Sequence, residues 1–178
     1  GYRVARSWEK AGALPSGKTL VVAAPGNLPP PSKRGDVFRQ AAVKALDTLS
    51  RNPNGFFLMI EGSNIDKAAH SNNLEEMMEE LLDFDRTAGA VLDWASKHPG
   101  TLVVITADHN TGAFALTGGS REQGEITGRF GSGSHDGVAV PVYAFGAGSG
   151  DFTGIYENTD IFNKIMNALK KGADKPVR

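Results

Sequence analysis

The chain contains no cysteine among its 178 residues. This absence excludes disulfide bonds and thiolate metal sites, so a bound metal ion would need histidine, aspartate or glutamate ligands. The sequence also has no apolar run of the roughly 20 residues that a membrane-spanning helix requires. Its first residues lack the basic segment followed by an apolar segment that marks a secretory signal peptide. We therefore expect no membrane partner.

The chain has no excess of charge of either sign. Its 19 lysine and arginine residues nearly balance 20 aspartate and glutamate residues, which gives a formal net charge of -1. Because no general positive field attracts polyanions, we expect no nucleic-acid partner, and any anionic ligand must be held by local groups. The length suits a single unit with a substantial core, and we expect residues 1–178 to form one α/β domain.

Short apolar runs alternate with amphipathic segments along the chain. Apolar residues recur at helical spacing in residues 37–49, 74–95 and 161–169, which predicts three helices. The second of these helices is expected to be capped near Asn72 or Asn73. Continuous apolar runs predict buried strands in residues 18–24, 56–60 and 101–106. A weaker strand is expected in residues 114–116, and residues 138–145 predict a further strand at an edge or with a bulge, because Pro141 lies inside it. This alternation is typical of an α/β fold with a mostly parallel central sheet flanked by helices, in which chemistry gathers at the carboxyl ends of the strands.

Ionisable side chains follow two of these predicted strands. The segment E-G-S-N-I-D-K-A-A-H covers residues 61–70, and T-A-D-H-N covers residues 106–110. If the two strands are parallel neighbours, both segments meet at one edge of the sheet. A third segment, G-S-H-D-G at residues 133–137, precedes the last predicted strand and adds His135. Carboxylates and imidazoles from three loops can then converge.

The first segment has two interpretations. Asp66 and His70 are four residues apart, which on a helix places them on one face, as metal ligands or as an ordinary capping or surface pair. Glu61 is either a further ligand or a surface charge that ends the strand.

The other two segments also have a simpler interpretation. Asp108 and His109 form either a metal-binding pair or a hydrogen-bonded pair beside a buried strand, and His135 alone would be a solvated loop residue. Taken together the groups favour a metal centre, because oxygen and nitrogen ligands from three loops suit zinc, with an all-oxygen position for magnesium nearby.

In their order and spacing, the motifs E-G-x-x-I-D-x-x-x-H, T-A-D-H and a glycine-flanked H before V-P-V-Y resemble the alkaline phosphatase family over roughly residues 55–170. The resemblance implies a first zinc ion at Asp66, His70 and His135. It implies that Asp108 and His109 belong to a second zinc ion, and that Glu61 is a magnesium ligand.

The resemblance also implies an activity. Members of the family hydrolyse phosphate monoesters through a covalent phosphoserine, with the zinc ions assisting both the serine and the attacking water. Lys67 matches a position near the phosphate in some members, and a solvated loop lysine is the alternative. Family members are usually exported, which implies a periplasmic or extracellular location.

The sequence departs from the family in one respect. The D-S-A nucleophile motif, the aspartate that bridges the second zinc and magnesium, and the phosphate-binding arginine have no match, so we assign no catalytic residue. We expect the chain to be the C-terminal, metal-binding portion of an alkaline phosphatase, with a sheet incomplete on its N-terminal side and little activity alone. An N-terminal portion of the same enzyme would complete it, and an unpaired sheet edge would also allow a homodimer.

Two alternatives stay open. One is another metallo-hydrolase of the same superfamily, such as a phosphodiesterase or a sulfatase-like enzyme. The other is a non-catalytic metal-binding or assembly domain.

Overall fold

The backbone of the computed structural model divides into two compact units, residues 1–87 and residues 88–178. The structure describes residues 1–11 and 17–173. Within these residues no helix is both long enough and apolar enough to cross a membrane. The prediction of one domain over residues 1–178 stays a prediction.

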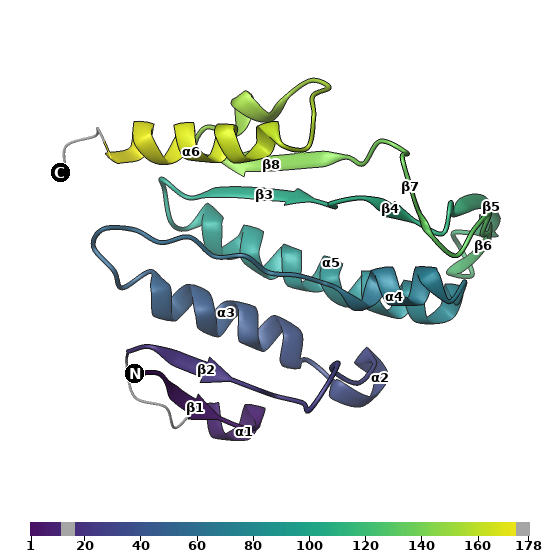
Figure 1. Cartoon of the computed structure of the whole chain (residues 1–178), viewed down its shortest axis with the longest axis horizontal. Coiled ribbons are helices and arrows are strands. Elements are labelled where there is room, and N and C mark those ends of the chain that lie inside the picture. The colour runs from purple at the N-terminus through teal and green to yellow at the C-terminus, as the bar shows by residue number, and fades with distance from the viewer. Residues whose placement is uncertain (12–16, 174–178) are drawn as a thin grey trace. The chain divides into compact units, whose positions relative to one another are not determined.

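The first unit combines one pair of strands with helices (Figure 1). Its elements are β1 (Arg3–Ala5), α1 (Trp8–Ala11), β2 (Thr19–Val21), α2 (Pro31–Arg34), α3 (Val37–Leu49), α4 (Asn64–His70) and the first part of α5 (Leu74–Ser96). Strands β1 and β2 are parallel, with Arg3 opposite Thr19. The predicted helix over residues 37–49 is confirmed, and Asp36 occupies its N-cap position. The Asp36 carboxylate, however, pairs with Arg39 instead of capping the backbone.

Residues 56–60 do not form the predicted buried strand. They belong to none of the two-stranded sheets that the described residues form. The side chains of Phe57 and Met59 are 65% and 73% exposed. Apolar sequence indicates which side chains avoid water, but a strand also needs a neighbour that completes its backbone hydrogen bonds. The prediction was wrong because this unit supplies no such neighbour within the described residues.

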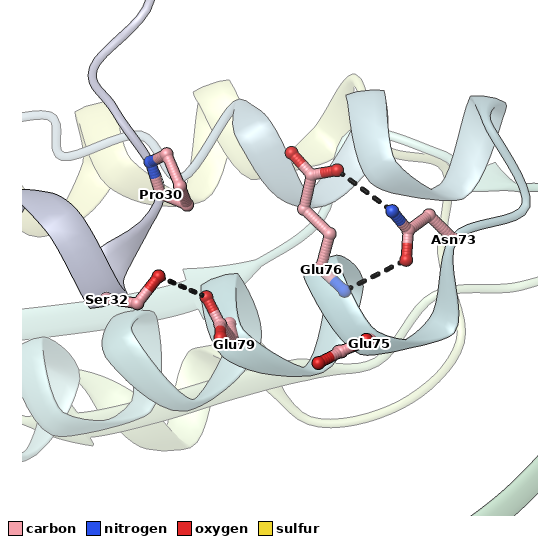
Figure 2. A pocket seen from close by; sticks show the side chains of 6 residues that line it. All are labelled: Pro30, Ser32, Asn73, Glu75, Glu76 and Glu79. Carbon is pink, nitrogen blue, oxygen red and sulfur yellow. Dashed lines mark hydrogen bonds between the residues drawn. The ribbon is translucent and has the colours of Figure 1, made fainter.

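The start of α5 is fixed by a reciprocal cap. The Glu76 backbone N–H donates to Asn73 Oδ1 at 3.2 Å, and Asn73 Nδ2 donates to Glu76 Oε2 at 3.2 Å (Figure 2). These bonds satisfy a backbone donor that the first turn of a helix otherwise leaves unpaired. The sequence-based prediction of a cap near Asn73 is confirmed.

A buried ionic network joins α2 to α5. Arg34 donates to Glu80 Oε2 at 2.6 Å and to Asp83 Oδ2 at 2.7 Å. The three side chains are only 5%, 4% and 3% exposed. Asn64, the first residue of α4, donates to Glu80 Oε1 at 3.2 Å. The network therefore ties α2, α4 and α5 together within the first unit.

The second unit contains three antiparallel strand pairs. They are β3 (Leu102–Thr106) with β8 (Val142–Gly146), β4 (Asn110–Thr111) with β7 (His135–Asp136), and β5 (Ala115–Ser120) with β6 (Glu125–Arg129). The short 3-10 helix η1 (Ser149–Phe152) and α6 (Asp160–Ala173) follow β8. Figure 1 shows β3 and β8 side by side. Opposite the Thr101 carbonyl, Gly146 has a φ of +91°, and a Cβ there would overlap that oxygen.

The α/β class is confirmed, but the pairing differs from the expected mostly parallel sheet. The described residues form four two-stranded sheets, and only β1 with β2 is parallel. Parallel neighbours need a crossover connection, usually a helix. Residues 107–141 between β3 and β8 contain short strands and no helix, so the chain returns antiparallel.

Candidate metal centre

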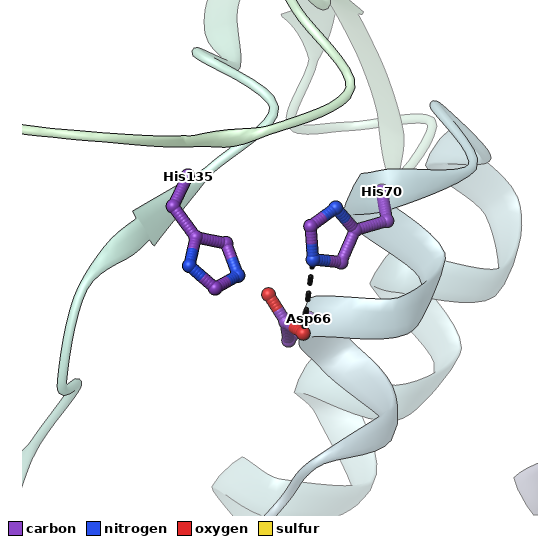
Figure 3. A group of neighbouring side chains, drawn as sticks. All are labelled: Asp66, His70 and His135. Carbon is purple, nitrogen blue, oxygen red and sulfur yellow. Dashed lines mark ion pairs between the residues drawn. The ribbon is translucent and has the colours of Figure 1, made fainter.

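The short helix α4 carries one pair of candidate ligands. The Asp66 Oδ2 and His70 Nε2 atoms lie 3.4 Å apart, and their side chains are 38% and 39% exposed. Figure 3 shows the two side chains reaching toward each other from successive turns of α4. The expectation that both lie on one helix face is therefore confirmed. Both groups are accessible enough to meet an ion.

Small residues in and before α4 allow close packing beside the Asp66–His70 pair. Ala68 and Ala69 are 1% and 4% exposed, so the face of α4 that they occupy is packed. Before the helix, a Cβ on Gly62 would lie 2.8 Å from Phe84 Cδ2, so only glycine lets the chain approach α5 this closely. The glycine of the E-G-x-x-I-D motif therefore has a packing role.

Two further candidates lie on either side of Asp66. Glu61 is exposed in the segment before α4. The Lys67 ammonium donates to Asn27 Oδ1 and, at 3.4 Å, to Asn64 Oδ1. Amide oxygens therefore hold this lysine in an exposed position.

The second unit carries another carboxylate–imidazole pair. The Asp108 Oδ2 and His109 Nε2 atoms lie 3.2 Å apart, with the aspartate 87% exposed and the histidine 29% exposed. On the other side of the ring, His109 Nδ1 lies 3.1 Å from Thr111 Oγ1. A partner at one ring nitrogen orients the imidazole so that the other nitrogen can serve as a ligand.

His135 lies beside His109. The ring centroids are 3.6 Å apart, and the planes are inclined by 24°. The neighbouring strands account for this contact, because β4 and β7 pair Thr111 with His135 and Asn110 with Asp136. The structure thus brings Asp108, His109 and His135 into one part of the second unit.

Sequence reasoning missed the most heavily hydrogen-bonded carboxylate of this region. Asp136 accepts hydrogen bonds from Asn110 Nδ2 and from the backbone N–H groups of Ala113 and Val138. The Val138 N–H bond lowers the pKa of Asp136 most; burial opposes it, and Asn110, Ala113 and the charge of His109 lower it further. The only sequence signals were the positions of Asp136 and Asn110 directly after His135 and His109.

The two pairs fit zinc by donor type and by spacing. A tetrahedral zinc ion with bonds of about 2.0–2.1 Å to oxygen and nitrogen holds neighbouring ligand atoms about 3.3 Å apart. The pair on α4 measures 3.4 Å, and the pair after β3 measures 3.2 Å. Each pair can thus occupy two neighbouring positions around one ion.

A separate pocket near the start of α5 does not suit a phosphate ester. It is lined by Pro30, Ser32, Asn73, Glu75, Glu76 and Glu79 (Figure 2). Ser32 donates to Glu79 Oε2 at 3.3 Å. The three carboxylates would repel an anionic substrate.

Comparisons with known proteins point to one family. The alkaline phosphatase family model matches residues 27–128, more than half of the chain. The chain is 29% identical to alkaline phosphatase 4 of Bacillus subtilis; the match covers 75% of this chain and 44% of that protein. With the alkaline phosphatase of Escherichia coli it shares 32% identity over 73% of this chain and 31% of the relative.

A solved structure agrees over almost the whole chain. A variant of the alkaline phosphatase of the Antarctic bacterium TAB5, solved with magnesium bound, is 33% identical with a TM-score of 0.83. The match covers 95% of this chain and 52% of that one. The chain therefore spans about half or less of the length of these proteins. By its family model, its relatives and its fold, the chain belongs to the alkaline phosphatase family.

Proposed function

We propose that the chain is the metal-binding portion of an enzyme that hydrolyses phosphate monoesters with zinc. The observation that carries this proposal is the presence of two carboxylate–imidazole pairs with oxygen–nitrogen separations of 3.4 Å and 3.2 Å. Both pairs stand at positions where the family motifs have metal ligands. Because the chain belongs to that family, the two pairs are better explained as metal ligands of a catalytic site than as incidental ion pairs.

The ligand assignment is part of the proposal. Following the family motifs, Asp66, His70 and His135 would hold one zinc ion and leave its fourth position open, as catalytic zinc sites do. Asp108 and His109 would contribute to a second zinc ion.

Magnesium would bind nearby through Glu61, an oxygen ligand of the kind that this ion prefers. Magnesium is bound in the solved TAB5 variant. Bound metal ions of this kind lower the pKa of a coordinated hydroxyl or water and neutralise charge on a phosphate and its leaving group.

Other residues of the chain would orient the metal ligands and bind the substrate phosphate. Thr111 holds the Nδ1 side of His109 at 3.1 Å, which leaves Nε2 facing Asp108. Lys67 offers an exposed ammonium one residue after Asp66, and its hydrogen bonds to Asn27 and Asn64 limit where that charge can move. We infer that Lys67 attracts the substrate phosphate directly or through water.

The nucleophile would come from an N-terminal portion of the same enzyme. No serine in this sequence follows an aspartate, as the family's nucleophile motif requires. Large apolar side chains are available to contact such a portion. Phe57 and Met59 are 65% and 73% exposed in the first unit, and Tyr143 and Phe162 are 64% and 66% exposed in the second. A homodimer would cover some of these side chains, and the enzyme would act in the periplasm or outside the cell.

The alternatives predict different behaviour on metal removal. In a non-catalytic domain whose metal serves structure, a chelator unfolds the chain. In our proposal the packing of α4 against α5 and the β3–β8 pair are independent of metal, so far-ultraviolet circular dichroism should change little when EDTA removes zinc. A phosphodiesterase or a sulfatase-like enzyme would differ from our proposal in its substrate, because it would prefer a phosphodiester or a sulfate ester to a phosphate monoester.

The proposal is tested by zinc content and turnover measured together. The zinc- and magnesium-loaded chain should contain zinc yet turn over no p-nitrophenyl phosphate at alkaline pH. Addition of the N-terminal portion of the TAB5 enzyme should produce turnover that His135→Ala abolishes, with a phosphodiester and a sulfate ester as poor substrates. Turnover by the chain alone, or a chain that binds no zinc, would contradict the proposal.

A further inference from the structure

The Asp136 carboxylate is the centre of a small hydrogen-bond network in the second unit. Its Oδ1 accepts from Asn110 Nδ2 at 3.1 Å and from the Val138 N–H at 3.1 Å. Its Oδ2 accepts from Asn110 Nδ2 at 2.9 Å and from the Ala113 N–H at 3.0 Å. Three donor groups thus make four contacts, two to each oxygen, because Asn110 Nδ2 lies within hydrogen-bond distance of both.

This network spans a very short strand pair. The β4–β7 ladder consists of the Asn110–Asp136 and Thr111–His135 pairs. Two residue pairs form too little ladder to fix a local structure by themselves. At one end the connection continues through the Gly112 N–H, which donates to the Ser134 carbonyl oxygen at 2.9 Å. At the other end the side-chain bridge between Asn110 and Asp136 holds the two strands together.

The bridge adjoins both imidazoles of the second unit. Asn110 directly follows His109, and Asp136 directly follows His135. The two rings stack with centroids 3.6 Å apart. Any change in the spacing of β4 and β7 must therefore change the spacing of the two rings.

The network also holds a backbone conformation that an L-residue adopts at a cost. Ala113 has a φ of +45°, in the left-handed region that non-glycine residues rarely occupy. Its N–H donates to Asp136 Oδ2. The same carboxylate therefore fixes the turn that leads out of β4.

We propose that Asp136 is a positioning residue that locks β4 to β7 and so holds His109 and His135 together for metal binding. The metal-binding part rests on the proposed function, whereas the effect on the two rings does not. Asp136 is not itself a ligand, because Asn110, Ala113 and Val138 occupy its two oxygens.

The Asp136→Asn substitution tests the positioning role, because it changes the shape of the side chain very little. One carboxylate oxygen becomes an NH₂ group, which cannot accept a hydrogen bond. In one orientation this group faces the Val138 N–H, and in the other it faces the Ala113 N–H. Either orientation places two donors against each other and frees one backbone group.

The experiment compares the full chain with Asp136→Asn and with Asp151→Asn. The second variant removes one negative charge from an exposed carboxylate of the same unit that pairs with Lys171, so it controls for charge alone. Imidazole proton and nitrogen shifts of the metal-free chain report the ring stack, and competition with a chromophoric chelator reports zinc affinity. Circular dichroism reports folding.

We expect Asp136→Asn to lose the ring-current shifts of His109 and His135 and to bind zinc about 10- to 100-fold more weakly, with wild-type helix content. Asp151→Asn should match wild type in both measurements. A merely structural role would lower the melting temperature and leave the ring shifts and the zinc affinity of the folded protein unchanged, which would overturn the proposal.

Two further outcomes are decisive. If Asp136→Asn does not fold, Asn110→Ala removes one donor and keeps the carboxylate; it should weaken the ring shifts, and unchanged shifts would overturn the proposal. If the wild-type chain binds no zinc, the proposed function fails. Loss of the ring shifts in Asp136→Asn would then still support positioning, and their persistence would refute it.

Discussion

Replacing Arg34 by methionine would remove the buried cation that two buried carboxylates share. Arg34 contacts Glu80 and Asp83 at 2.6 Å and 2.7 Å, and none of the three side chains is more than 5% exposed. Burial lowers the pKa of Arg34, but hydrogen bonds and attraction from both carboxylates outweigh it, and the pKa lies above its ordinary value. The guanidinium therefore stays charged within the fold.

The magnitude follows from this burial. Removing one partner of a buried ion pair costs about 3–5 kcal/mol, and here Glu80 would lose its cation while Asp83 would keep only the longer contact with Arg86. A domain is stable by only about 5–15 kcal/mol, so Arg34→Met should remove a large part of the free energy of unfolding. The Nε atom of Arg34 is buried without a hydrogen-bond partner, so the variant gives up no bond there.

Arg86→Met is a matched control. Arg86 also pairs with Asp83, at 3.4 Å, but its side chain is 58% exposed. An exposed pair contributes about 0–1 kcal/mol. Urea unfolding followed by circular dichroism should therefore show a far larger loss for Arg34→Met than for Arg86→Met. Equal losses in the two variants would refute the reasoning.

Three further predictions concern single features. Asn73→Ala removes the cap of α5 and should lower the free energy of unfolding by about 1 kcal/mol in a urea titration; no loss would mean that the cap is not formed. Gly146→Ala forces a Cβ onto a φ of +91° against a carbonyl oxygen, whereas a Cβ on Gly150 meets nothing within 4 Å, so only the first variant should lower the melting temperature. Lys171 lowers the pKa of Asp151 chiefly by a hydrogen bond; this carboxylate therefore stabilises the fold above its ordinary pKa, and the contribution is lost as the pH falls through the lowered value. A carboxyl ¹³C titration should show that midpoint rising toward the ordinary value in Lys171→Gln, and an unchanged midpoint would contradict the pairing.

Local features of the fold could be predicted from the sequence. The long helix α5 and its cap at Asn73 follow from strong periodicity and a good capping residue. The i,i+4 spacing of Asp66 and His70 predicted their shared helix face. These features depend on residues close together in the chain.

Pairing between distant segments could not be predicted in the same way. Residues 56–60 are as apolar as a buried strand, but whether they form one depends on a neighbouring strand that the sequence pattern does not reveal. Likewise, Arg34 and Asp136 gave no periodic signal, because their roles depend on partners such as Glu80 and Asn110 that the fold brings near.

A zinc titration of single-histidine variants tests the central claim most directly. Competition with a chromophoric chelator would compare wild type, His135→Asn and His98→Gln. His98 is a suitable control because it lies two residues beyond the end of α5, where its ring stacks on Trp94 with centroids 3.7 Å apart and its Nδ1 atom lies 2.7 Å from the Trp94 carbonyl oxygen. The account predicts zinc binding in wild type and His98→Gln and at least about 10-fold weaker binding in His135→Asn. Equal affinity in all three, or no zinc bound by the wild-type chain, would contradict it.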